Sequence, residues 1–400
     1  MRILVVSSFL PYPLYTGGHI RLYNLLLGLS KKHEIVLVAE KRLHQGKKDI
    51  EALEKICKKV VTVERKKQWS LGNILKAGFS GNSFLIVGHT NSQMKKEITK
   101  LLDEEKFDLI HIETSYVGQN LPSGIQLPVV LAEHNVEYLV YKRFADKAPA
   151  VLRPLLMLDI AKLEKLERSY WKRATKLIAV SEEERKIMGA DAVIPNGVDI
   201  KKFKPSTLDL RLSTKEDRVL FIGDFKWIQN RDAAEFIVKG IWPKVNGQWS
   251  MVNGQLKLWI VGKNIPDNIK KLGRANVIFD EDAPSEASEI FRRSKILLAP
   301  IRVGGGTSFK ILEAMASGVP VVTTKLGALG IGAVHDENIL IAETEEEFAK
   351  AIKNLLGDDK FYNKISKNAR ELIEESYDWD IIVSRLENVY KEAVECSICQ

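Results

Sequence analysis

A strand, a glycine loop and a helix follow one another within residues 296–323, and this unit constrains the fold more than any other stretch. Apolar residues 296–300 predict a buried strand, which runs into the three glycines Gly304 to Gly306, then Thr307 and Ser308, and then an amphipathic helix. Glycine lets the backbone approach a ligand closely, and free N–H groups at a helix start favour an anion. The unit therefore predicts a phosphate-bearing ligand near residue 305, with a plain tight turn as the alternative.

Strand-like and helix-like segments alternate along the rest of the chain. Strands are predicted at residues 2–7, 35–39, 60–64, 109–113, 129–133, 176–180, 193–194, 219–223, 256–262, 277–279, 319–323 and 339–342. Such alternation indicates α/β layers built on parallel sheets. Four hundred residues are too many for one small core, so we expect two domains. The turn residues 195–199 and the polar stretch 201–217 mark the boundary between them.

Three segments carry local predictions. A helix is expected from about residue 19 to 31, directly after the pair Gly17-Gly18. Two Asn-Gly repeats within residues 245–255 predict a surface hairpin. A long helix is expected over residues 153–173, and its predicted buried stripe is Leu155, Leu158, Leu163, Leu166 and Tyr170.

Residues 68–92 contain scattered glycines among apolar side chains and predict a loop-like segment. Trp69, Leu71, Phe79 and Phe84 are expected to be exposed there. The segment either faces an acceptor, or contacts a membrane, or forms an irregular helix.

The positive charge is concentrated in the first half of the chain. Residues 1–196 hold 31 basic and 22 acidic side chains, a net charge of +9, whereas residues 197–400 have a net charge of −1. The first half is therefore expected to meet an anionic membrane surface or a phosphorylated acceptor, unless its lysines only solvate the surface. Nucleic acid is not expected, because no Arg/aromatic cluster accompanies the charge.

The sequence shows no membrane span, signal peptide or disulfide framework. No apolar run approaches the roughly 18 residues that span a bilayer. Residues 2–10 predict a first strand and not a signal peptide. Cys396 and Cys399 have CxxC spacing but no second pair, and three cysteines make no disulfide framework. A cytoplasmic protein is expected, with contact at the inner face of the membrane if the basic half binds lipid.

These landmarks, in this order and spacing, resemble those of the GT-B glycosyltransferases of family 4. The motifs that carry the resemblance span almost the whole chain: the Gly17-Gly18 loop, Glu133-His134-Asn135, Pro195-Asn196-Gly197-Val198-Asp199, the segment 312–322 and the terminal helix that begins near Trp379. The resemblance implies an α/β fold of two Rossmann-like domains facing across a cleft. The first domain would comprise residues 1–196 with helix 377–400 packed back on it, and the second, donor-binding domain residues 197–376.

The resemblance also assigns roles to individual residues. His134 would lie beside the transferred sugar, and Gly17 and Gly18 would close over the donor from the first domain. Glu313 would accept the ribose hydroxyls of the nucleotide. The diphosphate would be held by Gly305, Gly306, Thr307 and Ser308 and by cations at Lys310, Arg302 and Lys226, with His134 and Lys310 as the catalytic pair.

Two departures from the family pattern set this chain apart. Eight residues before Glu313, where most members have a sugar-contacting glutamate, stands Gly305. The usual Arg/Lys pair after the strand ending at Gly223 is replaced by a Trp-x-x-Asn segment, Trp227 to Asn230. The chain is similar to a subgroup with a Gly-Gly-Gly-Thr-x-x-Lys loop, in which we infer that Lys310 supplies the missing charge.

The predicted function is hexose transfer, with retention, from a UDP- or GDP-sugar to a glycan or lipid-linked acceptor in polysaccharide, glycolipid or other glycoconjugate synthesis. No cofactor is expected, and no metal, because the two Asp-x-Asp strings at residues 280–282 and 378–380 are short enough to arise by chance. The alternatives are a GT-B nucleotide-sugar epimerase, a phosphorylase, which lacks its lysine context here, and a non-catalytic glycan- or nucleotide-binding protein. A redox enzyme is disfavoured because GxGxxG is absent.

Overall fold

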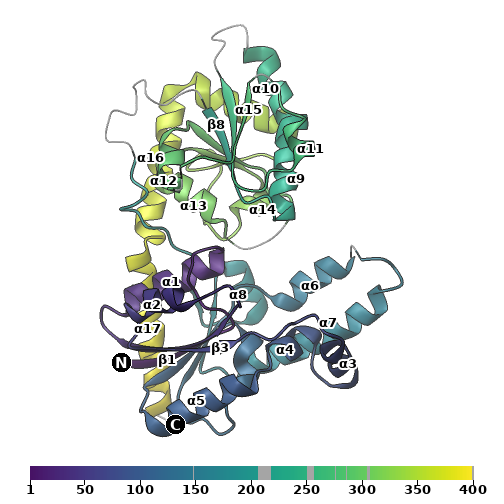
Figure 1. Cartoon of the computed structure of the whole chain (residues 1–400). Coiled ribbons are helices and arrows are strands. Elements are labelled where there is room, and N and C mark those ends of the chain that lie inside the picture. Colours follow the sequence, from purple (N-terminus) through teal and green to yellow (C-terminus); the bar gives the residue numbers. More distant parts are fainter. Residues whose placement is uncertain are drawn as a thin grey trace. The chain divides into compact units, whose positions relative to one another are not determined.

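The computed structural model describes residues 1–146, 148–205, 218–249, 256–274, 276–284, 286–303 and 307–398. The chain forms two compact units. The first comprises Met1–Pro195 and Ile382–Gln400, and the second Asn196–Ile381. Figure 1 shows that each unit has a central sheet with helices on both sides of it.

The first unit alternates strands and helices from its start. Its elements are β1 (Arg2–Ser7), α1 (Gly17–Leu29), β2 (Glu34–Lys41), α2 (Lys47–Glu54), β3 (Lys59–Glu64), α3 (Leu71–Phe79), α4 (Phe84–His89), α5 (Ser92–Glu104), β4 (Leu109–Glu113), the 3₁₀ helix η1 (Ser115–Asn120), β5 (Val129–Ala132), α6 (Glu137–Asp146), α7 (Arg153–Arg173), β6 (Lys176–Ala179), α8 (Glu182–Met188) and β7 (Ala192–Val193).

All seven strands of this sheet are parallel, in the order β3-β2-β1-β4-β5-β6-β7. Strand β1 is central, and its residues Ile3 to Val6 are all buried. Because both faces of the strand are covered, its sequence is a continuous apolar run and does not alternate between apolar and polar residues. The strand order reverses at β1, between β2 and β4, and ligands bind open α/β sheets at such points, beyond the carboxyl ends of the strands. Residues 8–18 and 114–120 follow those ends.

The second unit repeats the pattern with six parallel strands. Its elements are β8 (Arg218–Ile222), α9 (Ile228–Phe236), a π-helical turn η2 (Ile237–Ile241), α10 (Trp242–Trp249), β9 (Lys257–Val261), α11 (Asp267–Lys270), β10 (Val277–Asp280), α12 (Ala287–Arg292), β11 (Ile296–Ala299), α13 (Phe309–Ala316), β12 (Val321–Thr323), α14 (Lys325–Ala328), β13 (Leu340–Ile341), α15 (Glu345–Gly357) and α16 (Asp359–Ser376).

The strand order in this sheet is β10-β9-β8-β11-β12-β13. Side chains of β8 alternate between two cores, so that Val219 and Phe221 pack in one and Leu220 packs in the other. Both faces of the sheet are therefore covered, as the sequence pattern predicts. The order reverses between β8 and β11, and the predicted glycine loop follows β11.

The last helix, α17 (Trp379–Ile398), begins in the second unit and ends in the first. At its start, the Trp379 ring lies where a Cβ on Gly197 would approach it to 2.7 Å. Further along, a Cβ on Gly28 of α1 would meet Val383 at 2.4 Å. Glu387 binds Lys32 Nζ at 2.9 Å and His33 Nε2 at 3.1 Å. The helix is thus packed into the first unit through a glycine contact and an ion-pair cluster.

Four local predictions need correction. Helix α1 starts at Gly17, so the glycine pair forms its first turn, because Thr16 acts as the N-cap. The segment 68–92 is mainly helical and not loop-like, as the irregular-helix alternative allowed, with α3 and α4 capped by Ser70 and Ser83. The first Asn-Gly repeat lies within α10, not in a hairpin, and the second lies outside the described residues. In α7 the predicted stripe fails at its start, because Leu155 and Leu158 are exposed.

Candidate functional site

In the first unit, the start of α1 lies beside His134, which follows β5. A Cβ on Gly18 would lie 3.4 Å from the Phe9 ring and 3.6 Å from Cε1 of His134, so Gly18 has close neighbours on both sides. Phe9 also stacks edge-on against His19, whose Nδ1 lies 2.8 Å from the Thr16 hydroxyl. The structure therefore brings three predicted residues, Gly17, Gly18 and His134, together at the carboxyl edge of the sheet.

A buried carboxylate that the sequence analysis missed holds His134. Nε2 of His134 is hydrogen-bonded to Oε1 of Glu113, the last residue of β4, and Nε2 of His111 donates to Oε2 at 2.7 Å. Nε of Arg21 lies 3.7 Å from the same carboxylate. Burial alone would raise the pKa of Glu113, but the charge of His134 and the hydrogen bonds from His111 and His134 lower it well below its usual range.

The hydrogen-bond chain continues to the last helix. Tyr390 of α17 lies with its hydroxyl 2.9 Å from Nδ1 of His111. His111 therefore lies between Glu113 and Tyr390, hydrogen-bonded to one through each ring nitrogen. The signal available in the sequence was an alternating strand, His111-Ile112-Glu113, with polar side chains on one face of a buried strand.

A second group of carboxylates lies behind this site. Glu133 accepts hydrogen bonds from Ser115 N at 3.2 Å and from Trp171 Nε1 at 3.3 Å. Glu167 accepts from the backbone N–H groups of Glu137 and Tyr138, at the start of α6. Burial raises the pKa of Glu133 to about 8, and burial and the charge of Glu133 raise the pKa of Glu167. These glutamates fix η1, α6 and α7 around the loop that carries His134.

In the second unit, Lys310 is held at the start of α13. Its Nζ donates to Oδ1 of Asn230 at 2.9 Å and lies 4.8 Å from the centre of the Phe221 ring. Asn230 is fixed in turn, because its Nδ2 donates to Asp224 O at 2.8 Å and Gly223 leaves room for it. The Trp-x-x-Asn segment thus provides the residue that orients Lys310.

Glu313 follows one turn after Lys310 on the same helix. Burial raises the pKa of Glu313 to about 7, against the opposing charges of Lys202 and Lys310. Burial lowers the pKa of Lys310 to about 8, against the charge of Glu313. Lys310 and Glu313 thus lie on one helix face, and both have a pKa close to neutral pH. The ammonium of Lys310 can bind a polyanion, and the carboxylate of Glu313 can bind a diol.

The remaining predicted loop residues are placed in part. Thr307 is buried, and its Oγ1 has no hydrogen-bond partner among the described residues. Its carbonyl accepts from Nδ2 of Asn196 at 3.4 Å, which links the loop to the Pro-Asn-Gly segment. Ser308 is the N-cap of α13 but makes no side-chain capping bond. Gly305 and Gly306 lie outside the described residues.

The two other predicted cations differ from Lys310. Arg302 donates to Asp232 through Nε at 3.1 Å and Nη2 at 2.8 Å, and its guanidinium lies 4.1 Å from the centre of the Phe236 ring. Its charge is therefore matched by a carboxylate. Lys226 is exposed in the loop after β8. Neither side chain is in contact with Lys310 through any hydrogen bond between described residues.

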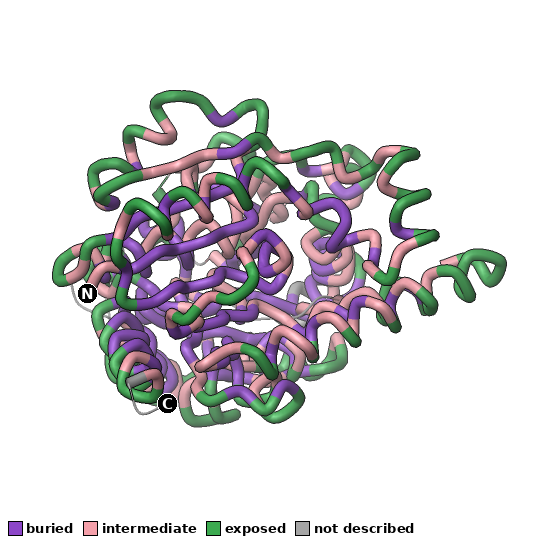
Figure 2. The backbone as a smooth tube through the Cα atoms, turned by 90° about the horizontal axis from the view of Figure 1, so that it is seen from below, coloured by how far each residue is buried: buried purple, intermediate pink, exposed green. Residues whose placement is uncertain are grey.

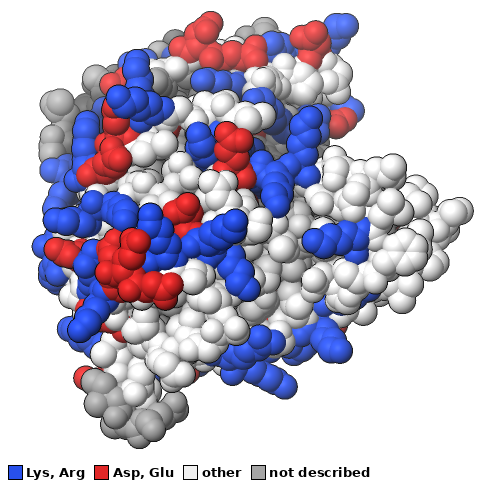
Figure 3. All heavy atoms as spheres, turned by 60° about the horizontal axis from the view of Figure 1, so that its bottom comes forward, with Lys and Arg blue, Asp and Glu red and all other residues white. Residues whose placement is uncertain are grey.

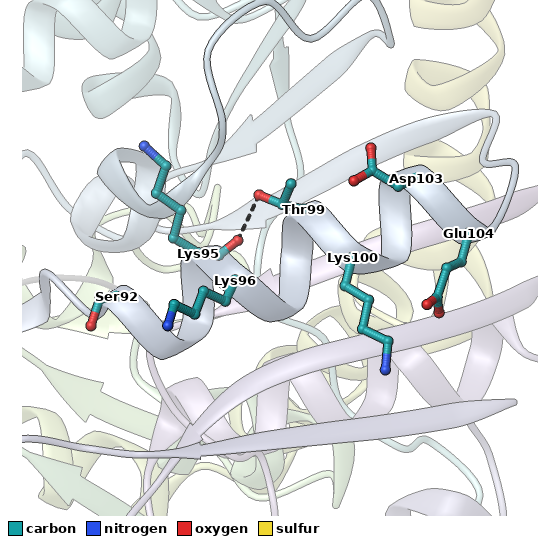
Figure 4. Close-up of a pocket in the computed structure, with 7 residues that line it drawn as sticks. All are labelled: Ser92, Lys95, Lys96, Thr99, Lys100, Asp103 and Glu104. Atoms are coloured by element: carbon teal, nitrogen blue, oxygen red, sulfur yellow. Dashed lines mark hydrogen bonds between the residues drawn. The ribbon is translucent and has the colours of Figure 1, made fainter.

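Other possible sites are less developed. Within the described ranges, no three His, Cys, Asp or Glu side chains form a group able to hold a metal ion. Asp280 of the first Asp-x-Asp string is bonded to Trp259 Nε1 and to the backbone N–H of Asp282. Figure 4 shows a surface depression whose lining residues all come from α5: Ser92, Lys95, Lys96, Thr99, Lys100, Asp103 and Glu104. No helix in the described part of the chain is both long and apolar enough to span a bilayer.

Two family models match the chain, one in each half. The model for glycosyltransferase family 4 matches residues 15–202, and the model for glycosyl transferases group 1 matches residues 216–358. The first match contains the glycines of α1 and His134. The second contains Asn230, Lys310 and Glu313.

Three known proteins show similarity over most of the chain. An uncharacterized 44.6 kDa protein in the cps region of Klebsiella pneumoniae is 28% identical, over 98% of this chain and 99% of its own. An Escherichia coli UDP-Gal:alpha-D-GlcNAc-diphosphoundecaprenol alpha-1,3-galactosyltransferase is 24% identical, over 74% of this chain and 78% of its own. The structure of Anabaena HepE with UDP and glucose has a TM-score of 0.65 at 17% identity, covering 98% of this chain and 99% of that one. This structural likeness shows the GT-B fold.

Proposed function

The chain belongs to the glycosyltransferases of family 4 and group 1, and from this premise we propose that it moves a hexose from a UDP- or GDP-sugar to an acceptor hydroxyl with retention. The acceptor we propose is a glycan or a lipid-linked sugar, in the synthesis of a polysaccharide, glycolipid or other glycoconjugate. A relative from a cps region and a relative named for a diphosphoundecaprenol acceptor support this choice.

The observation that carries the proposal is the arrangement of Lys310, Asn230 and Glu313 at the start of α13. Asn230 aims the ammonium, and the free backbone N–H groups of the helix start lie next to it. Together they would stabilise the negative charge that the diphosphate gains as the glycosidic bond loosens. Glu313, one turn further on, would accept the two ribose hydroxyls of the nucleotide.

In the first unit, His134 would lie beside the transferred sugar, with Gly17 and Gly18 giving the donor access to the backbone of α1. We assign no covalent nucleophile, and the leaving phosphate would take the proton of the acceptor hydroxyl. We also propose that the reaction needs no metal ion, so that activity persists in excess EDTA. The HepE structure with UDP and glucose supports a nucleotide-sugar donor.

The first experiment is a thermal-shift panel with UDP-, GDP- and ADP-sugars. We expect one nucleotide class to raise the melting temperature of the wild type and to have a much smaller effect on Lys310→Ala. Lys350→Ala, which removes an exposed lysine of α15, is the matched control and should respond like the wild type. No shift with any donor would contradict the proposal.

Turnover separates transfer from epimerisation. A transferase releases nucleoside diphosphate in proportion to acceptor glycosylation, whereas an epimerase acts on the donor without an acceptor. We therefore expect nucleotide release above the hydrolysis background only when a sugar diphosphate lipid, or a short-chain analogue of it, is added. Acceptor-independent conversion of the donor sugar would favour the epimerase.

A further inference from the structure

Helix α3 presents its apolar stripe to solvent. Leu71, Ile74 and Leu75 have exposed fractions of 74%, 48% and 52%, and Phe79 has 92%. Ala77 is the buried residue of the helix. Spacings of three, four and eight residues place these four side chains on one face, which in a globular protein normally faces the core. Their exposure marks a surface that is built to be covered.

The first turns of α7 expose a second apolar row. Leu152, Leu155 and Leu158 are spaced by three residues and have exposed fractions of 50%, 67% and 64%. Phe144, at the end of α6, is 65% exposed. Figure 2 shows that the joined ends of α6 and α7 extend away from the rest of the first unit, at the right of the view, and are largely exposed.

The two rows belong to one surface, because α3 and α4 are bonded to the middle of α7. Lys162 Nζ of α7 donates to Ala77 O of α3 at 2.7 Å, and Asp159 Oδ1 accepts from Phe84 N of α4 at 2.8 Å. Leu158 and Leu155 stand one and two turns before Lys162 on the same side of α7. We name the surface formed by Leu71, Ile74, Leu75, Phe79, Leu152, Leu155 and Leu158 the apolar ledge.

The charged side chains of α3 and of the chain segments on either side of it are all basic. Between residues 65 and 96 the sequence has six basic side chains and no Asp or Glu. Lys66, Lys67 and Lys76 are exposed among them. Figure 3 shows a broad uncharged region at the right of the view, where α3 and α7 lie, with Lys and Arg at its margins.

We propose that the apolar ledge docks onto a lipid membrane that carries anionic headgroups. Exposed leucine and phenylalanine side chains would enter the boundary between headgroups and acyl chains, and the lysines beside them would attract the anionic lipids. A protein partner would need acidic groups of its own to match these lysines. Binding to a protein would also not require the segment 65–96 of this chain to lack acidic residues throughout, whereas binding to anionic lipids favours it.

The position of the apolar ledge suits an acceptor held by the same membrane. Helix α6 begins three residues after His134, and its ten residues span about 15 Å. Its far end carries the exposed Phe144 and leads along the chain to Leu152, the first residue of the apolar ledge in α7 and its N-cap. The sugar of a lipid-linked acceptor would then need to reach His134 across about the length of this helix. This link rests on the proposed function, whereas lipid binding itself does not.

Sedimentation with vesicles tests the docking surface without any turnover. We expect the protein to bind vesicles of phosphatidylcholine mixed with phosphatidylglycerol, to bind vesicles of phosphatidylcholine alone much less, and to release from the mixed vesicles at high salt. The double variant Phe79→Ser/Leu155→Ser should bind the mixed vesicles at least about tenfold more weakly, because it removes two large apolar side chains. Leu43→Ser, which changes an 87% exposed leucine elsewhere in the first unit, should bind like the wild type.

Other occupants and other failures have separate readouts. Unchanged vesicle binding of the double variant would overturn the proposal. A lipid-free dimer that the double variant converts to a monomer in light scattering would assign the apolar ledge to a second copy of the chain, and would also overturn it. With a soluble acceptor analogue, the double variant should retain wild-type turnover. Vesicle binding without any donor turnover would refute the proposed function and leave the docking surface intact.

Discussion

His134 and Glu113 are joined by a hydrogen bond between Nε2 of the imidazole and Oε1 of the carboxylate, although they stand at the ends of two different strands. The carboxylate is fully buried, and its second oxygen is held by His111. Glu113 is therefore a positioning residue for His134: it fixes the ring orientation and keeps a negative charge behind it. The sequence motif around His134 gave no indication of this partner.

Replacing Glu113 by Gln should lower kcat roughly ten- to hundredfold, because a hydrogen bond to a charged group contributes about 1.5–3 kcal/mol. The donor KM should change much less, since Glu113 lies behind His134. The variant also removes the charge next to the buried Arg21, so its melting temperature should be measured alongside. Steady-state kinetics with saturating acceptor give both constants.

Tyr390→Phe is the milder companion, because it removes only the hydroxyl that bonds His111. It should fold normally and lower kcat by less than Glu113→Gln. Equal kcat for wild type and both variants would show that the buried hydrogen-bond chain is structural only.

The pH dependence of kcat/KM for the donor should be bell-shaped. The carboxyl of Glu313, whose pKa is raised to about 7, must lose its proton to accept the ribose hydroxyls, so activity falls below that pH. The ammonium of Lys310, whose pKa is lowered to about 8, must keep its proton, so activity falls above that pH. Lys310→Arg should shift the alkaline limb of the profile to higher pH, because a guanidinium stays charged. An alkaline limb unchanged in that variant would exclude Lys310 as its source.

Arg302→Ala should affect donor binding far less than Lys310→Ala. The guanidinium is exposed and already paired with Asp232, and such surface pairs contribute about 0–1 kcal/mol. The donor KM should therefore change by a factor of about five or less. Competition binding with nucleoside diphosphate on both variants checks the order. A larger loss in Arg302→Ala would mean that Arg302 leaves Asp232 to bind the diphosphate.

The free energy of unfolding should fall as the pH rises from 4.5 to about 8, the range in which Glu133 is protonated in the folded state only. Its pKa is raised from 4.5 to about 8 on folding, so the folded state binds more protons than the unfolded state between these values. Each pH unit in this range should cost up to about 1.4 kcal/mol. Ser115 N and Trp171 Nε1 bond different oxygens of Glu133, so Glu133→Gln keeps an acceptor for only one of them. The amide does not titrate, and the variant should therefore show a flatter profile in urea unfolding. Identical slopes for wild type and variant would place the pH dependence elsewhere.

The strand pattern could be predicted because parallel strands are buried on both faces and appear as unbroken apolar runs, such as Ile3 to Val6. The extent of α7 also followed from a local signal, namely helical spacing. Apolar spacing could not distinguish a stripe that meets the core from one that meets solvent. Leu155 and Leu158 continue the pattern of Leu163 but lie beyond the edge of the first unit's core.

The candidate site was predictable where one motif holds several residues, as with Lys310 and Glu313 on α13. Partners that come from distant segments were not predictable from one sequence. Asn230 reaches Lys310 across 80 positions, and Tyr390 reaches His111 across 279. These contacts depend on the order of strands in the sheets, which the local sequence does not encode.

The path of α17 has a consequence for biosynthesis. The first unit is built from residues 1–195 and 382–400, so its sequence is interrupted by the entire second unit. While the ribosome makes the intervening segment, the surface of α1 around Gly28 and the side chains of Lys32, His33 and His111 await their partners on a helix not yet synthesised. The contacts that α17 makes with the first unit, including the bond between Tyr390 and His111, can therefore form only after the whole second unit has been synthesised.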